Sequence, residues 1–308
     1  MKPDVLIKRT NYLIFTIVIF YTISQLTLYL TLGDEWIERN YYPFLVFIQL
    51  IIIMLPVLIF LYRYKLNPVK AFRIKKITGM EAFLIVMMAV SSSLIASVLN
   101  AAVIYFLEKI GTIPLDNVPT PQSIPELWIQ ILVIALIPAI CEELFFRGII
   151  YGSYKGMGAR MSIFISAFYF ALFHFDIRNL LGPFLLGLLL AWYCYRTGSV
   201  FAGIVAHFTN NLLAVLINWY NRDIIVEQMV LTEETMGQLF VLALVVGCIL
   251  VILMKAFVVI TRKEAKMDSD EGAKLPLSLI AHWPMWFFYA AYLVITVRLL
   301  TLITKPLL

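Results

Sequence analysis

Charged residues are scarce in this chain. Asp, Glu, Lys and Arg make up only 14% of its 308 residues, whereas hydrophobic residues make up 62%. This composition excludes an ordinary water-soluble globular fold. Cysteine is rarer still: the three cysteines are odd in number and lie in apolar stretches, so no disulfide framework is implied. Long polar segments are also missing, which excludes an independent soluble domain.

Long apolar runs take the place of those polar segments. A helix needs about 20 apolar residues to span a bilayer, and nine stretches approach or reach that length. They fall near Tyr12–Thr31, Pro43–Tyr62, Ala82–Phe106, Trp128–Ile149, Met161–Phe175, Leu180–Tyr195, Val200–Tyr220, Leu239–Ile260 and Leu279–Ile303. The sequence therefore predicts an all-α, polytopic helical membrane protein with about 8–9 transmembrane helices. We interpret the short fifth and sixth stretches as a helical hairpin, with a single broken element as the alternative. The last stretch is expected to span, although an interfacial helix is the alternative.

Basic residues are unevenly distributed among the connectors. They crowd the segment 63–76, whereas acidic residues dominate the segment 34–38. Because cytoplasmic loops are enriched in Lys and Arg, the basic segment and the N-terminus should both be cytoplasmic. Three further basic connectors, at 155–160, at Arg196 and at 262–266, fall on the same side by alternation. The net charge of +5 reflects this bias, and no nucleic-acid partner is predicted.

Three ionisable residues, Glu142, Glu143 and Arg147, stand near the end of the fourth stretch. Each such group at a helix centre costs about 2.5–3.5 kcal/mol, so a functional site in the membrane is the default interpretation. Glu143 and Arg147 are spaced i,i+4 with the acid N-terminal, which favours an ion pair on one helix face. Glu142 is rotated by about 100° and is left to face a cavity, which a kink at Pro138 would help to open.

Histidine is as rare as cysteine, and two of the three histidines, His174 and His207, lie in stretches after the glutamates. In a membrane interior, histidine commonly carries protons, binds metal or donates a hydrogen bond. A packing role, bonded to a neighbouring helix, is the alternative. Phe170 shares a helix face with His174, and Asn211 shares one with His207, both at i,i+4. Small residues precede His207 and allow close helix packing, so three helices can converge on one polar pocket.

These residues form three ordered motifs, Glu142-Glu143-x-x-x-Arg147, Phe170-x-x-x-His174 and His207-x-x-x-Asn211. In this order they resemble the signature of the type II CAAX prenyl endopeptidase family, also called the CAAX protease and bacteriocin-processing group, whose members are intramembrane proteases. The resemblance covers about residues 131–214. We therefore predict N-terminal transmembrane helices at 1–126, a catalytic core like that of the CAAX proteases at 127–220, and C-terminal transmembrane or interfacial helices at 221–308.

The resemblance implies hydrolysis of a peptide bond in a membrane-embedded or lipid-anchored peptide or protein. Glu142 and His174 would activate a water, while His207 and Asn211 would stabilise the oxyanion of the tetrahedral intermediate. Glu143, Arg147 and Phe170 would support these four residues. No cofactor is favoured. The alternative is a metalloendopeptidase-like scheme in which Glu142, His174 and His207 bind zinc, although no His-Glu-x-x-His helix is present.

Two other classes of function use the same pocket. One is a non-catalytic membrane scaffold or bacteriocin-immunity protein, which would use the pocket for binding. The other is a proton-coupled transporter, because intramembrane Glu and His also form proton relays. No internal repeat with paired broken helices is visible, which argues against transport. Richness in Ile, Lys and Tyr and short loops favour a bacterial plasma membrane, with an organellar membrane as the alternative.

Overall fold

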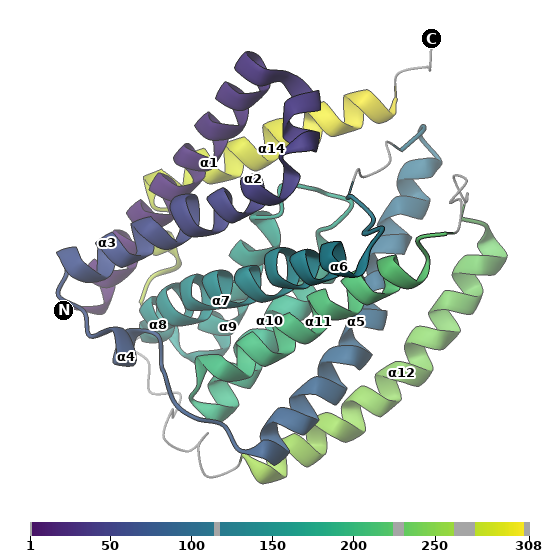
Figure 1. Ribbon diagram of the computed structural model, residues 1–308. Coiled ribbons are helices and arrows are strands. Elements are labelled where there is room, and N and C mark those ends of the chain that lie inside the picture. The colour runs from purple at the N-terminus through teal and green to yellow at the C-terminus, as the bar shows by residue number, and fades with distance from the viewer. Residues whose placement is uncertain (1, 114–117, 224–230, 262–274, 305–308) are drawn as a thin grey trace.

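The computed structural model describes residues 2–113, 118–223, 231–261 and 275–304, and every regular element within these ranges is a helix (Figure 1). All nine predicted apolar stretches are helical. The first stretch is α1 (Pro3–Arg39) and the third is α5 (Gly79–Glu108). The second is one continuous path of α2 (Tyr41–Phe47), η1 (Ile48–Met54) and α3 (Leu55–Arg63). The fourth is a longer path of α6 (Ile124–Gln130), η2 (Ile131–Leu136), α7 (Ile137–Glu143), η3 (Leu144–Ile150), α8 (Tyr151–Tyr154) and η4 (Lys155–Met157). The remaining five are α9 (Ala159–Leu172), α10 (Leu181–Thr197), α11 (Val200–Tyr220), α12 (Glu233–Ile260) and α14 (Trp283–Ile303). Two short helices, α4 (Pro68–Ala71) and η6 (Leu277–Leu279), lie in connectors.

Seven of the helical paths in the described ranges are long and apolar enough to cross a bilayer, and α14 is among them. The other two, α9 and α10, have 14 and 17 residues and pack against each other. The predicted hairpin is therefore confirmed, and so is the polytopic all-α class. The predicted eight to nine spans correspond to seven helices of spanning length together with this shorter pair.

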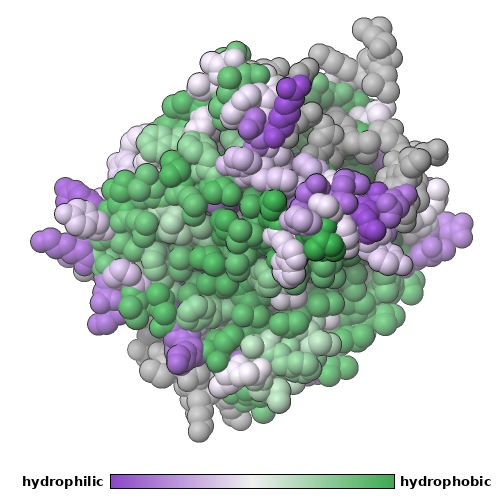
Figure 2. All heavy atoms as spheres, viewed as in Figure 1, coloured by the Kyte–Doolittle hydropathy of each residue, from purple (hydrophilic) through white to green (hydrophobic). Residues whose placement is uncertain are grey.

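The outer surface is suited to lipid. Large hydrophobic side chains such as Phe83, Ile252 and Val259 are exposed. On the face shown in Figure 2, hydrophobic residues cover a broad central area and hydrophilic residues gather toward the margins. Soluble monomers rarely expose apolar patches larger than a few hundred Å², because water disfavours them. The chain is an integral membrane protein.

The helices are arranged around the α6–α8 path (Figure 1). On one side α1 packs against α14, and on the other α12 packs against α5, at the two edges of the molecule. Helices α10 and α11 contact each other and both contact α5, and α11 also runs along η2 and α7. The α6–α8 path is thus enclosed by helices from the N-terminal part and from the part that follows it.

Three segments of these helices, η1, η2 and η3, are π-helical. Both η1 and η2 end two residues before a proline, Pro56 or Pro138. Proline has no N–H, so the carbonyl four residues earlier loses its α-helical partner, and the helix adjusts locally. At Pro138, where we predicted a kink, the structure has a π-helical segment that ends two residues earlier, and the kink itself stays a prediction. Such π-helical segments often occur at functional sites.

The connectors that we predicted to share one side meet at one end of the bundle. Val200 N donates to Arg73 O at 3.2 Å, and Ser199 Oγ donates to Lys75 O. Arg196 Nε donates to Thr261 Oγ1 at 3.0 Å. The predicted basic connector at 262–266 lies outside the described residues. These contacts place the segment 63–76 next to the connector that follows Arg196, and Arg196 next to the end of α12.

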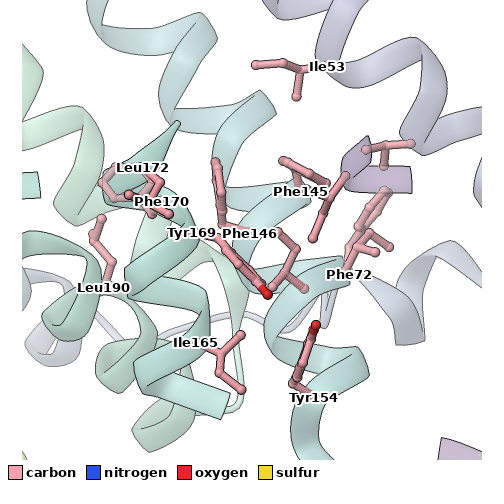
Figure 3. Packing of buried hydrophobic residues seen from close by; sticks show 14 of the residues in the cluster. Ile53, Phe72, Phe145, Phe146, Tyr154, Ile165, Tyr169, Phe170, Leu172 and Leu190 are labelled. Atoms are coloured by element: carbon pink, nitrogen blue, oxygen red, sulfur yellow. The ribbon is translucent and has the colours of Figure 1, made fainter. Parts of the chain in front are cut away.

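Aromatic rings form much of the buried core (Figure 3). Phe146 and Phe170 meet edge to face with centroids 5.2 Å apart, and both are almost fully buried. Phe145 packs against Phe146 at 4.8 Å. Edge-to-face ring pairs add to the burial of apolar area and hold helices at a defined separation. This packing joins η3 to α9.

Candidate active site

A cavity of about 510 Å³ lies within the bundle, and the four predicted catalytic residues all line it: Glu142, His174, His207 and Asn211. Glu142 comes from α7, His174 from the turn after α9, and the other two from α11. The predicted convergence of three helical segments on one polar pocket is therefore observed. From the apolar run we expected the two glutamates near the end of their helix. The helical path continues to Met157, so they lie near its middle instead.

Glu143 and Arg147 form the predicted ion pair. Arg147 Nη1 lies 2.6 Å from Glu143 Oε1, and neither side chain has any exposed area. Arg147 Nη2 also donates to the carbonyl of Gly187 at 3.2 Å, which ties α10 to this helix. Neither residue lines the cavity. A buried pair of this kind is strongly destabilised when one partner is removed, because the other charge remains buried.

The same carboxylate oxygen, Glu143 Oε1, accepts from His207 Nδ1 at 3.0 Å. The contact depends on Gly203, because a Cβ there would lie 2.4 Å from Glu143 Oε2. A carboxylate only accepts hydrogen bonds, so Nδ1 carries a proton and Nε2 is left for the cavity. The neutral ring presents an acceptor at Nε2, and the imidazolium presents a donor. Sequence reasoning assigned Glu143 to Arg147 alone, because spacing along one helix gives no information on a partner 64 residues away.

His174 is oriented by the residue one helical turn before it. Its Nδ1 lies 2.9 Å from the carbonyl oxygen of Phe170, which can only accept, so Nδ1 is the protonated nitrogen. In the neutral ring Nε2 therefore carries a lone pair. His174 is exposed to the cavity that it lines. The arrangement presents a proton acceptor to the same space as Glu142.

Phe170 contacts both histidines, which goes beyond the predicted contact with His174. Its ring meets His174 at 5.1 Å and His207 at 5.6 Å between centroids, edge to face in both cases. The Arg147 guanidinium lies 4.4 Å from the centroid of the same ring. The ring labelled in Figure 3 thus packs against both imidazoles and against the guanidinium, and it limits the rotation of the imidazoles.

Asn211 donates from Nδ2 to the carbonyl of Ile134 at 3.1 Å. That carbonyl would accept from residue 138 in a regular α-helix, but Pro138 has no N–H to donate. Asn211 therefore compensates for the proline. An amide nitrogen has two hydrogens, so one N–H of Asn211 remains for the cavity. Asn210, which also lines the cavity, donates to Asn211 Oδ1 at 3.0 Å and orients the amide.

Several polar residues of the cavity were missed by sequence reasoning. Gln49 of η1 donates from Nε2 to Glu142 Oε1 at 2.7 Å. It is the only amide or charged residue from Pro43 to Tyr62, and that isolation was the signal that could have revealed it. Helix α5 adds a further polar stripe that ends at Asn100. The stripe consists of Ser92, Ser93, Ser97 and Asn100.

The zinc alternative can be compared with the geometry of the described residues. Within these ranges, no group of three or more His, Cys, Asp and Glu side chains is arranged to hold a metal ion. His207 Nδ1 and one oxygen of Glu142 are engaged by protein groups. Whether activity depends on a metal stays a prediction.

A comparison with protein families identifies the segment around the cavity. Residues 124–213 match the family described as type II CAAX prenyl endopeptidase Rce1-like. No significant match was found among curated proteins or among solved structures. The matched segment begins at α6 and ends in α11, and it contains all three motifs. For this segment, the match confirms the resemblance to the type II CAAX prenyl endopeptidases that the motifs predict.

Proposed function

We propose that this protein is an intramembrane endopeptidase that hydrolyses a peptide bond in a membrane-embedded or lipid-anchored substrate. The family points to a protease. The observation that carries the proposal is the shared cavity, which Glu142, His174, His207 and Asn211 all line. A structural cluster would have been closed by mutual hydrogen bonds, whereas these side chains border a space of about 510 Å³.

In this proposal Glu142 and His174 activate the attacking water. Gln49 engages one carboxylate oxygen of Glu142, which leaves the other oxygen to accept a proton from water. His174 Nε2 provides a second acceptor, because Nδ1 is bound to a carbonyl. Two acceptors bordering one cavity can orient a water molecule and remove its proton as it attacks. The protonated Glu142 then gives that proton to the departing amine as the C–N bond breaks.

Asn211 and His207 stabilise the developing oxyanion. The free N–H of Asn211 is a neutral donor held in place by the Ile134 carbonyl. His207 acts as a donor in its imidazolium form, in which it makes an ion pair with Glu143. Donors that are positioned before the reaction lower the barrier, because they need no reorganisation as charge develops.

The test is direct detection of hydrolysis. Purified protein in lipid would be incubated with membrane-inserted peptides in water enriched in the heavy oxygen isotope, and new termini would be identified by mass spectrometry. A protease incorporates the label into the new carboxyl terminus, and the matched Glu142→Gln variant does not. Peptide binding that is unchanged in Glu142→Gln, without any cleavage by the wild type, would instead indicate a scaffold or immunity protein.

The same assay tests metal dependence. We expect activity to survive dialysis against a strong chelator, because the proposed chemistry uses protein groups alone. Loss of activity that zinc restores, with about one metal bound per chain, would replace this scheme by the metalloendopeptidase-like one.

We also propose that the N-terminus and the basic connectors face the cytoplasm of a bacterial cell. The clustering of Arg73, Lys75 and Arg196 at one end of the bundle supports this orientation. A cysteine introduced at the exposed Lys70 should resist an impermeant thiol reagent in intact cells. Ready labelling from outside would reverse the orientation.

A further inference from the structure

Gln49 is a buried amide in the most apolar helical path of the protein. The path from Tyr41 to Arg63 is the most apolar of the seven described spans, and Gln49 is 7% exposed. Its Nε2 donates to Glu142 Oε1, whereas its own Oε1 is buried without a partner among the described atoms. The residue lies outside the segment that matches the family.

An unpartnered buried carbonyl oxygen is unfavourable. A methionine of similar shape would fill the same volume without this cost. The contact made by Nε2 must therefore account for an amide at this position. That contact is charge-assisted, because a carboxylate accepts it, and such bonds are roughly twice as strong as neutral ones.

The backbone supports the contact. Gln49 lies at the start of η1, the π-helical segment that ends before Pro56. A π-helical turn changes the direction of the side chains relative to a regular α-helix. The η1 segment contacts α7, which bears Glu142. Two neighbouring helices, each irregular before a proline, thus bring the amide and the carboxylate together.

We propose that Gln49 is a positioning residue for Glu142, and this inference rests on the proposed function. By holding Oε1, the amide restricts rotation of the carboxylate and directs Oε2 toward the water near His174. Without the amide, the carboxylate could rotate away or be oriented by solvent in the cavity. The N-terminal helices thereby contribute to the site, although the family motifs all lie in the later segment.

Gln130 provides a matched control. It is a fully buried glutamine in α6, at the start of the next π-helical segment. Its Nε2 donates to Tyr42 Oη at 2.9 Å and to the Pro119 carbonyl at 2.6 Å, and it does not line the cavity. Replacing either glutamine by methionine removes a buried amide of the same size, but only one replacement affects Glu142.

The first measurement is steady-state kinetics on a cleaved peptide. Gln49→Met should lower kcat by about 10- to 100-fold, the usual loss for one hydrogen bond to a charged group. KM should change by less than about threefold, because the bond orients a base and does not bind substrate. Gln130→Met should leave kcat per folded molecule unchanged. An unchanged kcat in Gln49→Met, or an equal fall in both variants, would overturn the positioning role.

The second measurement does not require activity. Thermal unfolding of Gln49→Met, Glu142→Met and the double variant should be non-additive, because the two side chains are in contact. The cycle of Gln130→Met with Glu142→Met should be additive. Additive effects for Gln49 would overturn the inference even if the protein proved to be a protease. A wild type that cleaves nothing would reject the proposed function, while a non-additive Gln49 cycle would still support the ordering of Glu142 by Gln49.

Discussion

Two clusters of polar side chains inside the helix bundle differ in what surrounds them. The cavity cluster consists of Glu142, His174, His207 and Asn211, and each of its members borders the cavity. The α1 cluster consists of Thr10, Asn11, Ser153 and Tyr154, and it is buried between α1, α8 and η6. The cavity cluster faces the cavity, whereas the members of the α1 cluster form hydrogen bonds with one another and with nearby backbone.

The α1 cluster satisfies its own hydrogen bonds. Thr10 Oγ1 donates to Ser153 Oγ at 2.7 Å, and Tyr154 Oη donates to Asn11 Oδ1 at 2.5 Å. Asn11 Nδ2 donates to the Leu279 carbonyl at 2.8 Å. All of these groups are neutral side chains or backbone. They fasten α1 and the segment before α14 to the central helix path.

The comparison shows that burial of polar groups in an apolar bundle does not by itself indicate chemistry. Both groups need internal partners, since lipid offers none. The cavity cluster differs because it contains ionisable groups and keeps atoms free beside a cavity. The third histidine, His282, lies outside the cavity cluster and packs edge to face on Tyr12 at 5.3 Å near the α1 cluster.

The largest expected effect is loss of activity in Glu142→Gln. The amide keeps the shape of the side chain but cannot accept the proton of the attacking water, so proteolysis should fall below detection, by about 10²-fold or more. Thermal stability should be nearly unchanged, since the cavity tolerates a neutral group. Peptide cleavage and thermal unfolding of the purified variant check both statements. Retained cleavage would place this residue with the structural group.

Glu143→Gln should affect stability above all. It breaks the buried pair with Arg147 and also removes the acceptor for His207 Nδ1. Loss of one partner of a buried pair costs about 3–5 kcal/mol, so the unfolding temperature should fall clearly below that of Glu142→Gln. The two glutamates are adjacent, which makes each variant the control for the other. Equal loss of stability in both would remove the distinction between them.

Asn211→Ala should lower kcat by about 100- to 1000-fold, the usual effect of one missing oxyanion donor. KM should change much less, because the bond strengthens in the transition state. The Ile134 carbonyl also loses its donor, so a modest fall in stability should accompany the kinetic effect. A higher KM with intact turnover would make Asn211 a substrate-binding residue.

The smallest effect is expected in the α1 cluster. Asn11→Leu leaves the Leu279 carbonyl and the Tyr154 hydroxyl without this partner, and unfolding should become easier by about 1–3 kcal/mol. The kcat of folded protein should stay unchanged, because no member of the cluster lines the cavity. Chemical or thermal unfolding, read beside peptide cleavage, tests this separation. A fall in kcat without a fall in stability would contradict it.

Contacts between residues four positions apart could be predicted from the sequence. The ion pair of Glu143 with Arg147 and the packing of Phe170 on His174 both follow from i,i+4 spacing. The nine apolar stretches also became nine helical paths, because helix formation in a membrane depends on local composition and length. The hairpin of α9 and α10 followed from a connector of four residues, three of them polar, between two short runs.

Contacts between helices were decided only by the tertiary structure. The bond from His207 to Glu143 joins α11 to α7, and the bond from Gln49 to Glu142 joins η1 to α7. Neither contact can be inferred from the spacing of residues along the chain, because the rotation of each helix about its axis depends on packing and on the π-helical segments before prolines. The sequence by itself determined which residues could carry the chemistry. The folded arrangement decided which atoms remain free to do so, since a polar atom buried in lipid-facing helices is available only where its neighbours leave a cavity.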